Sequence, residues 1–428
     1  MMRAAPEYDV AVVGSGLAGA CAAALLAHRS GLAAERIVLI DSTPAAPRVP
    51  MAAPPELRVV AISRASERVL RAARAWEQVR AARLCSYEHM RVWHESSSPD
   101  GSAVLSFDAA DVGEPNLGYI AENGELQAAC LDSFRAAGGR LLSSPLESWT
   151  LEADAARLQL AAAPPLRTRL IVGADGARSL VRRGARLGVR TRDYDQVALV
   201  ATIGSSQPHR HTAWQRFLRS GPLALLPLFD GSCSLVWSLD SRYAAALREC
   251  PSEQFSARLD AASARVLGHT TLASERLSFP LYSLAADSYV SARCALIGDA
   301  AHVIHPLAGQ GANLALLDAA ALCEAVADAL CEREDPGALR TLRRYERARR
   351  THNVVMDRAM SLFQQLFSAG GAAASAVLNG GLGAVNRSSM IKRWFALQAL
   401  GLGTDLPRFA RAAGAARHAA AIAGQRGN

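Results

Sequence analysis

The chain has 428 residues, of which half are hydrophobic and a fifth are charged, so it is long enough for two domains or one two-lobed unit with a large core. Its formal net charge of +8 comes almost entirely from arginine, and no basic run with interleaved aromatic residues accompanies it, which argues against nucleic acid as a partner. The eight cysteines form no C-x-x-C pair and no apolar window is long enough for a membrane-spanning helix, so reduced thiols and a cytoplasmic protein are expected.

A nucleotide-binding pattern begins at residue 8. The β-branched run Tyr8–Val13 has strand length, and an alanine-rich helix and a second strand follow it. Between the first strand and the helix stand three glycines in G-x-G-x-x-G spacing, Gly14, Gly16 and Gly19. This order permits a tight turn, lets a pyrophosphate approach the backbone and lets the helix pack on the strand, although a purely structural glycine turn is the alternative. Asp41, at the end of the second strand, is placed to accept the ribose hydroxyls of FAD or NAD rather than the phosphorylated ribose of NADP.

The next segments alternate between two expected lobes. Arg58 follows a proline- and alanine-rich loop and is either a phosphate clamp or a surface arginine. Alternation in residues 85–110 indicates strands outside the first lobe, and Ile120–Phe134 is expected to form a helix that returns to it. Asp175 follows another buried strand, where it serves a ligand site or, like Ser179, caps the next helix.

The second lobe and a third ligand segment complete the pattern. Residues 195–239 contain β-rich runs separated by hairpin turns, which predict a mainly antiparallel sheet. A later apolar strand ends at Gly298 and Asp299, whose carboxylate can accept hydrogen bonds from ligand hydroxyls. The loop that follows contains His305 and Pro306, and a long helix is expected from about residue 313. A helix that starts at glycines exposes backbone N–H groups and favours negative charge at its N-terminus.

Three of these stretches stand in a fixed order, GSGLAG at 14–19, GADGARS at 173–179 and GDAAHVIHPLAGQGANLAL at 298–316. Together they resemble the single-component flavoprotein aromatic hydroxylases that have the para-hydroxybenzoate hydroxylase fold. Further stretches are similar to the ubiquinone-biosynthesis branch of that family: LRVVAISRASERVL, LGYIAENGELQ, ALVATI and QRFLRSGPLALLPLFDG. The resemblance extends from about residue 8 to about residue 405.

The element pattern and the resemblance together imply an α/β, two-lobed fold. It comprises a Rossmann-like FAD-binding domain, an inserted and mainly antiparallel β-sheet substrate domain, and C-terminal helices. The FAD-binding domain is expected to comprise residues 1–84, 113–188 and 286–345. The substrate domain is expected to comprise 85–112 and 189–285, and the helical region 346–428.

The resemblance also assigns residues to FAD. The three glycines of the first motif would face the pyrophosphate, Asp41 the adenosine ribose, and Arg58 the phosphates or the flavin. Asp175 would serve both FAD and the nicotinamide donor, and Asp299 would hold the ribityl chain. Residues 311–313 would lie against the isoalloxazine ring. The implied set is Gly14, Gly16, Gly19, Asp41, Arg58, Asn123, Asp175, Gly298, Asp299, Gly309, Gly311, Ala312 and Asn313.

The activity implied by the resemblance is hydroxylation of the aromatic ring of a polyprenylated phenol or quinol in ubiquinone biosynthesis. NAD(P)H would reduce FAD, and O₂ would add at flavin C4a to give the hydroperoxide that hydroxylates the ring. His305 and Pro306 are the candidate catalytic residues, with a scaffold role as the alternative for the histidine. Residues 83–107 favour C5 of a 2-polyprenylphenol, with C6 and C1 as alternatives. No cluster has metal-ligand spacing.

The apolar tail of such a substrate implies that it is taken from a membrane. Peripheral contact at the inner membrane through the C-terminal helices is therefore expected, with Phe363, Leu366 and Phe367 near an arginine-rich run, unless these helices simply pack on the protein. A homo-oligomer and a ubiquinone-biosynthesis complex are open. So are three other functions: a hydroxylase of another aromatic compound, a flavin reductase of isoprenoid double bonds, and an FAD-binding scaffold subunit.

Overall fold

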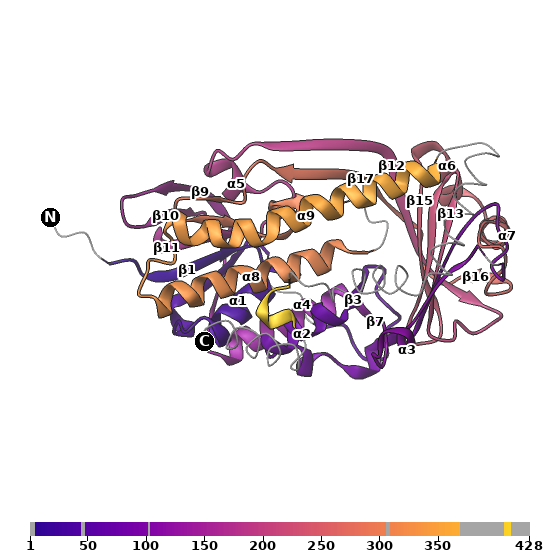
Figure 1. Ribbon diagram of the computed structural model, residues 1–428, viewed down its shortest axis with the longest axis horizontal. Coiled ribbons are helices and arrows are strands. Elements are labelled where there is room, and N and C mark those ends of the chain that lie inside the picture. Colours follow the sequence, from indigo (N-terminus) through magenta and orange to yellow (C-terminus); the bar gives the residue numbers. More distant parts are fainter. Residues whose placement is uncertain (1–4, 44–47, 102, 305–308, 369–405, 412–428) are drawn as a thin grey trace, which may run out of the picture.

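The computed structural model describes residues 5–43, 48–101, 103–304, 309–368 and 406–411, with the side chains of 357 and 359–368 left out of the description. Two large β-sheets lie toward opposite ends of an elongated molecule, and the helix α9 (Leu339–Ser368) runs from one toward the other (Figure 1). The expected α/β class is confirmed, because one sheet is mixed and flanked by helices and the other is mainly antiparallel.

The first sheet is built around parallel, buried strands. Its spatial order is β18-β19-β11-β1-β2-β8, and β10 and β9 continue from β11 as antiparallel strands. The central runs YDVAVV and IVLID read as unbroken hydrophobic stretches because buried parallel strands have little exposed face. The strands are β1 (Tyr8–Val13), β2 (Ile37–Asp41), β8 (Arg140–Ser143), β9 (Leu146–Leu151), β10 (Ala156–Leu160), β11 (Leu166–Gly173), β18 (Val290–Ser291) and β19 (Cys294–Leu296).

The carboxyl ends of four of these strands meet at one edge. Val13 at the end of β1 pairs with Gly173 of β11 on one side and Ile40 of β2 on the other, and Gly173 pairs in turn with Leu296 of β19. Each sequence motif follows one of these strand ends, so segments far apart in the chain come together. Ligands of such sheets bind at this edge.

The second sheet has the order β20-β17-β12-β15-β14-β13-β5-β6, with β16 paired to β12. Its neighbours are antiparallel except for β13 and β5, which are parallel. The helices α6 (Ser241–Glu249) and α7 (Ser252–Ala262) cover one face, where Trp237 and Leu199 pack with Phe255. The strands are β5 (His89–His94), β6 (Leu105–Asp108), β12 (Val189–Ser205), β13 (Thr212–Leu218), β14 (Gly221–Pro227), β15 (Cys233–Asp240), β16 (Thr270–Leu272), β17 (Leu277–Ala286) and β20 (His302–Val303).

A small third sheet corrects one expectation. Its strands β3 (Val59–Ser63) and β4 (Leu84–Tyr87) both pair with β7 (Gly118–Glu122). The helix expected over Ile120–Phe134 therefore begins only at Asn123, as α4 (Asn123–Ala136). Residues 120–122 are strand because they find hydrogen-bonding partners on both sides, and such tertiary pairing overrides local propensity.

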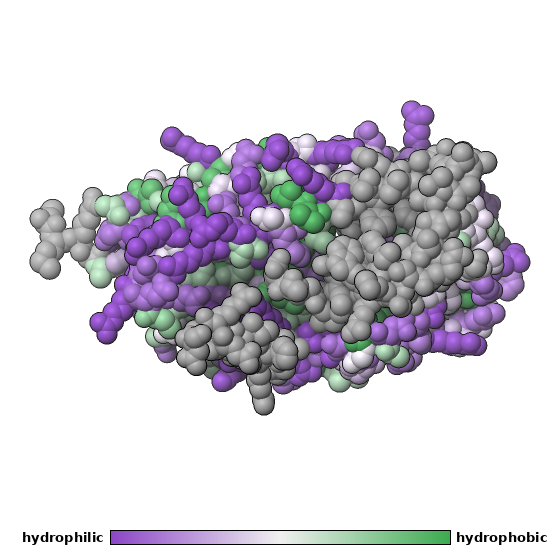
Figure 2. Space-filling view, in the orientation of Figure 1, coloured by the Kyte–Doolittle hydropathy of each residue, from purple (hydrophilic) through white to green (hydrophobic). Residues whose placement is uncertain are grey.

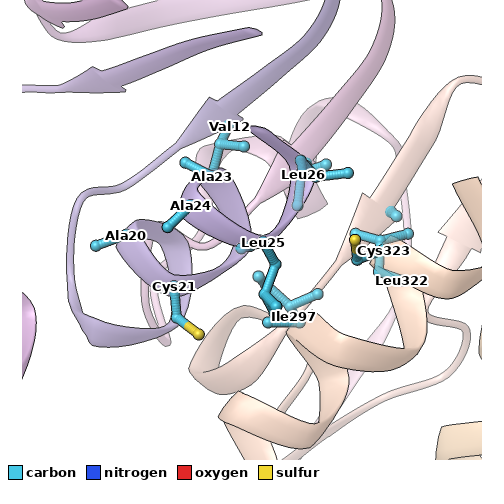
Figure 3. Packing of buried hydrophobic residues seen from close by; sticks show 14 of the residues in the cluster. Val12, Ala20, Cys21, Ala23, Ala24, Leu25, Leu26, Ile297, Leu322 and Cys323 are labelled. Atoms are coloured by element: carbon cyan, nitrogen blue, oxygen red, sulfur yellow. The ribbon is translucent and has the colours of Figure 1, made fainter. Parts of the chain in front are cut away.

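The core of the first lobe depends on small side chains. The helix α1 (Leu17–Arg29) packs against α8 (Gly311–Cys331), and its alanines and Cys21 let the two helices approach closely. Figure 3 shows Leu25 of α1 beside Ile297, with Leu322 and Cys323 of α8 in the same cluster. Burial of this apolar surface, at roughly 25 cal/mol per Å², stabilises the lobe.

The remaining helices are short. They are α2 (Arg64–Ala72), α3 (Ala109–Val112), α5 (Leu180–Gly184) and the 3₁₀ turns η1 (Ala34–Arg36), η2 (Trp76–Gln78), η3 (Ala81–Arg83), η4 (Gly298–Ala300) and η5 (Arg408–Ala410). None of the helices that the structure describes has the length and apolar character needed to cross a membrane. On the face shown in Figure 2, the described residues are mainly hydrophilic, with hydrophobic ones in small separate groups. The division into six segments stays a prediction.

Candidate active site

An open cleft of about 690 Å³ is formed where the strand ends of the first sheet meet. Nine of the thirteen predicted cofactor residues line it: Gly14, Gly16, Asp41, Arg58, Asn123, Asp175, Asp299, Gly311 and Ala312. The other lining residues include Leu17, Ala18, Ser42, Val60, Gln127, Pro145, Leu146, Gly176, Arg178, Arg183 and Ala315. All three sequence motifs thus contribute to one concave site.

The turn after β1 is held by close backbone contacts. Gly14 has a φ of +103° and donates its N–H to the carbonyl of Ile40 at 2.8 Å, and a Cβ at this position would overlap the carbonyl of Ala174. Gly19 packs directly on the Gly14 carbonyl, which brings α1 over the turn. Gly16 differs, because no atom lies within 4 Å of the position that its Cβ would take. Its backbone therefore faces the open cleft.

Asp41 forms the wall of the cleft at the end of β2. Its Oδ2 accepts the backbone N–H of Ser15 at 2.6 Å, and its Oδ1 accepts that of Thr43 at 2.9 Å. Burial raises the pKa of this carboxyl, but the hydrogen bonds from Thr43 and Ser15 outweigh burial and leave the pKa below its usual value. An ionised carboxylate has room for further donors, such as ribose hydroxyls.

Arg58 reaches the cleft from the segment before β3. Its carbonyl accepts the N–H of Asn123 at 2.9 Å, which joins it to the start of α4. Behind it, Arg83 forms a buried ion pair with Glu122, with Nε 2.5 Å from Oε2, and donates to four carbonyls of the preceding loop. The other oxygen of Glu122 accepts the N–H of Glu56 at 2.7 Å. The pair therefore fixes the segment that carries Arg58.

Asp175 both lines the cleft and caps α5. Its Oδ2 accepts the N–H groups of Leu180 at 2.6 Å and Val181 at 3.1 Å, and Oδ1 accepts the hydroxyl of Ser179 at 2.5 Å. The Ser179 hydroxyl in turn accepts the N–H of Arg182 at 2.9 Å. The capping role left open by the sequence is thus present for both Asp175 and Ser179.

Asp299 projects into the cleft from the turn after β19. Its side chain is accessible from the cleft and is surrounded by protein on its other sides. Burial raises the pKa of Asp299, and the positive potential of His302 and Arg58 opposes that rise. Gly298, just before it, adopts the left-handed backbone with φ +56°. The arrangement presents a carboxylate to a ligand at this end of the cleft.

The start of α8 supplies backbone rather than side chains. Gly311 has open space where a Cβ would lie, and Ala312 also lines the cleft. The Asn313 side chain is only 2% exposed, since its Oδ1 accepts the N–H of Ser63 at 3.0 Å and its Nδ2 donates to the carbonyl of Ala61 at 2.9 Å. Asn313 therefore fastens α8 to β3. Gly19 in α1, Gly298 in η4 and Gly309 do not line the cleft.

Of the two histidines just before this helix, His302 is among the described residues and His305 is not. His305 and Pro306 lie outside the described residues. His302 is 4% exposed, and its Nε2 donates to Oδ2 of the buried Asp318 at 2.5 Å. This environment fits a scaffold role for His302. In the part of the chain that the structure describes, no group of His, Cys, Asp and Glu side chains could hold a metal ion.

Several lining residues were missed by sequence reasoning. Gln127 donates from Nε2 to the carbonyl of Ser15 at 2.9 Å, and it lies four residues after Asn123, so helical spacing could have placed it on the same face. Arg178 belongs to the second motif, which was read for its acid rather than its cation. Leu146 is the first residue of β9 and carries no recognisable signal in the sequence.

Comparison with known proteins decides the family. A family model described as an FAD binding domain matches residues 151–358. The ubiquinone hydroxylase UbiL of Rhodospirillum rubrum is 35% identical over 408 residues, which covers 94% of this chain and 92% of that relative. The chain belongs to the FAD-dependent hydroxylases of ubiquinone biosynthesis.

Two further likenesses extend the comparison of this hydroxylase. The 3-demethoxyubiquinol 3-hydroxylase of Escherichia coli (strain K12) is 34% identical to it over 396 residues, covering 92% of this chain and 98% of the relative. The crystal structure of p-nitrophenol 4-monooxygenase PnpA from Pseudomonas putida DLL-E4 matches with a TM-score of 0.73 at 17% identity, over 92% of this chain and 98% of that one. The latter likeness shows the shared fold.

FAD is the cofactor of this hydroxylase, and the cleft fits it. In the strand order β19-β11-β1-β2, Asp299 follows the first strand and Asp41 ends the last, so two hydroxyl acceptors stand apart along the edge. Between them lie the bare backbone of Gly16 and the cations Arg178 and Arg183. Such a site suits a long ligand with hydroxyls near both ends and phosphates between them.

Proposed function

We propose that FAD lies along the carboxyl edge of the first sheet, with its adenosine ribose at Asp41 and its pyrophosphate over Gly14 and Gly16. Its ribityl chain then reaches Asp299, and the flavin lies against the start of α8. The observation that supports this placement is the convergence of all three motifs on one cleft of about 690 Å³. Arg58 lines the same cleft as Asp299 and serves as a cation for the phosphates or the flavin.

The substrate is the aromatic ring of a polyprenylated phenol or quinol. Full-length similarity to a ubiquinone hydroxylase and to a 3-demethoxyubiquinol 3-hydroxylase supports this class. We assign C5 of a 2-polyprenylphenol as the first candidate position, on the resemblance of residues 83–107. The C6 position of a demethoxyubiquinol is the second candidate, because the similar Escherichia coli protein is a 3-demethoxyubiquinol 3-hydroxylase.

Bound FAD supplies the oxygen-transfer chemistry, with NAD(P)H and O₂ as co-substrates. The chain itself has to orient the cofactor and the ring and to exclude water. Of the described titratable residues that line the cleft, arginines cannot accept a proton, Asp41 and Asp175 are engaged by hydrogen bonds, and Asp299 is assigned above to the ribityl chain. His305 and Pro306 therefore remain the catalytic candidates, with the histidine as acceptor of the phenol proton.

The polyprenyl tail requires access to a lipid phase. We assign this access to peripheral contact at the inner membrane through the C-terminal helices, with Phe363, Leu366 and Phe367, whose side chains lie outside the described part of the chain. Assembly with other ubiquinone-biosynthesis proteins is part of the same proposal. Pelleting of the full chain with anionic liposomes, compared with a chain shortened after about residue 360, tests it. Equal pelleting of the two would refute the assignment to that region.

The test of the activity uses the FAD-loaded protein with NADH or NADPH and two probes, a 2-polyprenylphenol and a demethoxyubiquinol. The expected result is faster oxidation of the nicotinamide with a probe than without it, and a product that gains one oxygen atom. The ring position of that atom, found by mass spectrometry and NMR, decides between C5 and C6. A yellow protein that is inert with both probes and with simple phenols would favour the scaffold function instead.

A further inference from the structure

Asp318 on α8 has a fully buried carboxylate that serves four donors. Its Oδ2 accepts the backbone N–H of Gly298 at 3.2 Å and the Nε2–H of His302 at 2.5 Å. Its Oδ1 accepts Nε–H of Arg349 at 2.9 Å and Nδ2–H of Asn353 at 3.2 Å. These four donors are satisfied by the carboxylate, whereas Nη1 of Arg349 is buried without a hydrogen-bond partner among the described residues.

The two oxygens of this carboxylate face different elements. The donors to Oδ2 are Gly298, just after β19, and His302, the first residue of β20, whereas the donors to Oδ1 lie on α9, which runs beside α8 (Figure 1). A second link joins the same elements, because the hydroxyl of Tyr345 on α9 donates to the carbonyl of Leu296 at the end of β19 at 2.6 Å. The loop after β19 is therefore tied to α9 through two sets of buried hydrogen bonds.

The surrounding groups keep Asp318 ionised. Burial raises the pKa of its carboxyl, but the charge and hydrogen bonds of His302 and Arg349 outweigh burial and lower the pKa to about 2. The rings of Tyr289 and His302 lie 5.7 Å apart, and Tyr345 packs behind Tyr289 at 6.5 Å. Hydrogen bonds to an ionised acceptor are stronger than neutral ones, so this junction holds the loop firmly.

Asp299 stands between the two loop residues that the junction holds, one position after Gly298 and three before His302. Asp299 lines the cleft, whereas Asp318 is buried behind it. We propose that Asp318 is a positioning residue that fixes both ends of the segment presenting Asp299 to FAD, and that it makes this geometry depend on how α9 is seated. The role rests on the proposed placement of FAD and is independent of the aromatic substrate.

The first test asks whether His302 acts on FAD binding through its hydrogen bond to Asp318 or through another property of its ring. The variants His302→Gln and His302→Leu are compared for FAD affinity, by flavin fluorescence quenching, and for the shape of the visible flavin bands. Glutamine keeps an N–H donor for Asp318, so wild-type behaviour is expected, whereas leucine is expected to weaken FAD binding about tenfold, the effect of losing one charge-assisted hydrogen bond. Equal damage by both variants, or no damage by leucine, would overturn the proposal.

The second test asks whether α9 contributes. Asn353→Leu removes one donor to Asp318 from the α9 side, and it is expected to weaken FAD binding by a factor of about 3 to 10 without touching the cleft. The double variant Asp318→Leu with Arg349→Met removes both buried charges together, so the fold is retained while the loop loses its acceptor. It is expected to bind FAD with altered flavin bands. Wild-type affinity and bands in both variants would refute the positioning role.

The matched control is Asp328→Asn, on the same helix α8. Asp328 forms an exposed ion pair with Arg408 at 2.7 Å and does not line the cleft, so FAD affinity is expected to stay unchanged. All readouts use FAD alone. A protein that responds as expected here and yet turns over no phenol would overturn the activity proposed above and leave the role of Asp318 standing.

Discussion

Arg83 and Glu122 form a buried ion pair behind the cleft, with 0% and 2% of their side chains exposed and Nε 2.5 Å from Oε2. The pair holds the chain between residues 50 and 56 through the hydrogen bonds of both partners. Arg83→Leu would leave Glu122 charged and buried, so we expect a loss of about 3–5 kcal/mol in the free energy of unfolding. Urea denaturation measures it.

The control for this change is Arg340→Leu. Arg340 is 70% exposed and pairs with Glu334 at 3.1 Å, so its loss is expected to cost less than about 1 kcal/mol. Similar values for the two variants would show that the Arg83 pair does not stabilise the loop. The Arg83 variant should also bind FAD more weakly, because the same loop delivers Arg58 to the cleft.

Substitutions of Gly16 and Gly19, which belong to one motif, are expected to affect the stability of the apoprotein differently. A side chain at Gly16 would enter open space in the cleft, so Gly16→Val should leave the thermal midpoint of the apoprotein within a few degrees of wild type. It should weaken FAD binding by at least about tenfold, because the valine would occupy the path of the pyrophosphate. Gly19→Val should instead destabilise the apoprotein, since its Cβ would overlap the Gly14 carbonyl. Calorimetry measures the stability and FAD titration measures the binding. A Gly19→Val apoprotein as stable as wild type would contradict the expectation for Gly19.

The strand-glycine-helix-acid unit could be predicted because its information is local. Gly14, Gly16 and Asp41 are read from spacing within one stretch, and the strand order then brings that stretch to the other motifs. The resemblance extended this to Asp175 and Asp299, which also line the cleft. The α/β class and the antiparallel second sheet followed from the same periodicities.

What could not be predicted depends on partners far away in the chain. No local sequence pattern predicts the ion pair between Asp318 and Arg349, and none predicts the pair between Arg83 and Glu122. Residues 120–122 became strand because β3 and β4 flank them, which local propensity does not reveal. Asn313 is predicted from its motif to lie against the flavin, and its two side-chain hydrogen bonds to β3 could not be predicted from that motif.

Asp299 should link FAD binding to pH. Burial raises the pKa of this carboxyl, so the folded apoprotein holds the proton more tightly than the unfolded chain does. Stability from this group is therefore full below the ordinary pKa of about 3.9 and falls as pH rises through the raised value. Asp299→Asn removes the ionisable group and with it this loss of stability at higher pH. We therefore expect an apoprotein that is at least as stable as wild type at pH 7 but binds FAD more weakly.

The same variant supplies the pH control. The ionised carboxylate is the better hydroxyl acceptor, so wild-type FAD affinity should fall as pH is lowered toward the raised pKa, and the asparagine variant should lose this component. Fluorescence titrations between pH 5 and pH 8 measure both proteins. Parallel pH profiles would exclude Asp299 as the titrating acceptor.

The thiols should differ sharply in reactivity. Cys331, at the end of α8, is the exposed cysteine, whereas Cys85, Cys233 and Cys294 are buried and burial raises the pKa of these thiols to about 11, 12 and 12. Because the thiolate is the reactive form, a colorimetric thiol reagent at pH 8 should label one cysteine rapidly in the native protein and all eight in denaturant. Cys331→Ser should abolish the rapid phase without changing FAD binding. A rapid phase that survives this substitution would come from Cys250, which is only partly buried, or from a thiol exposed by local opening.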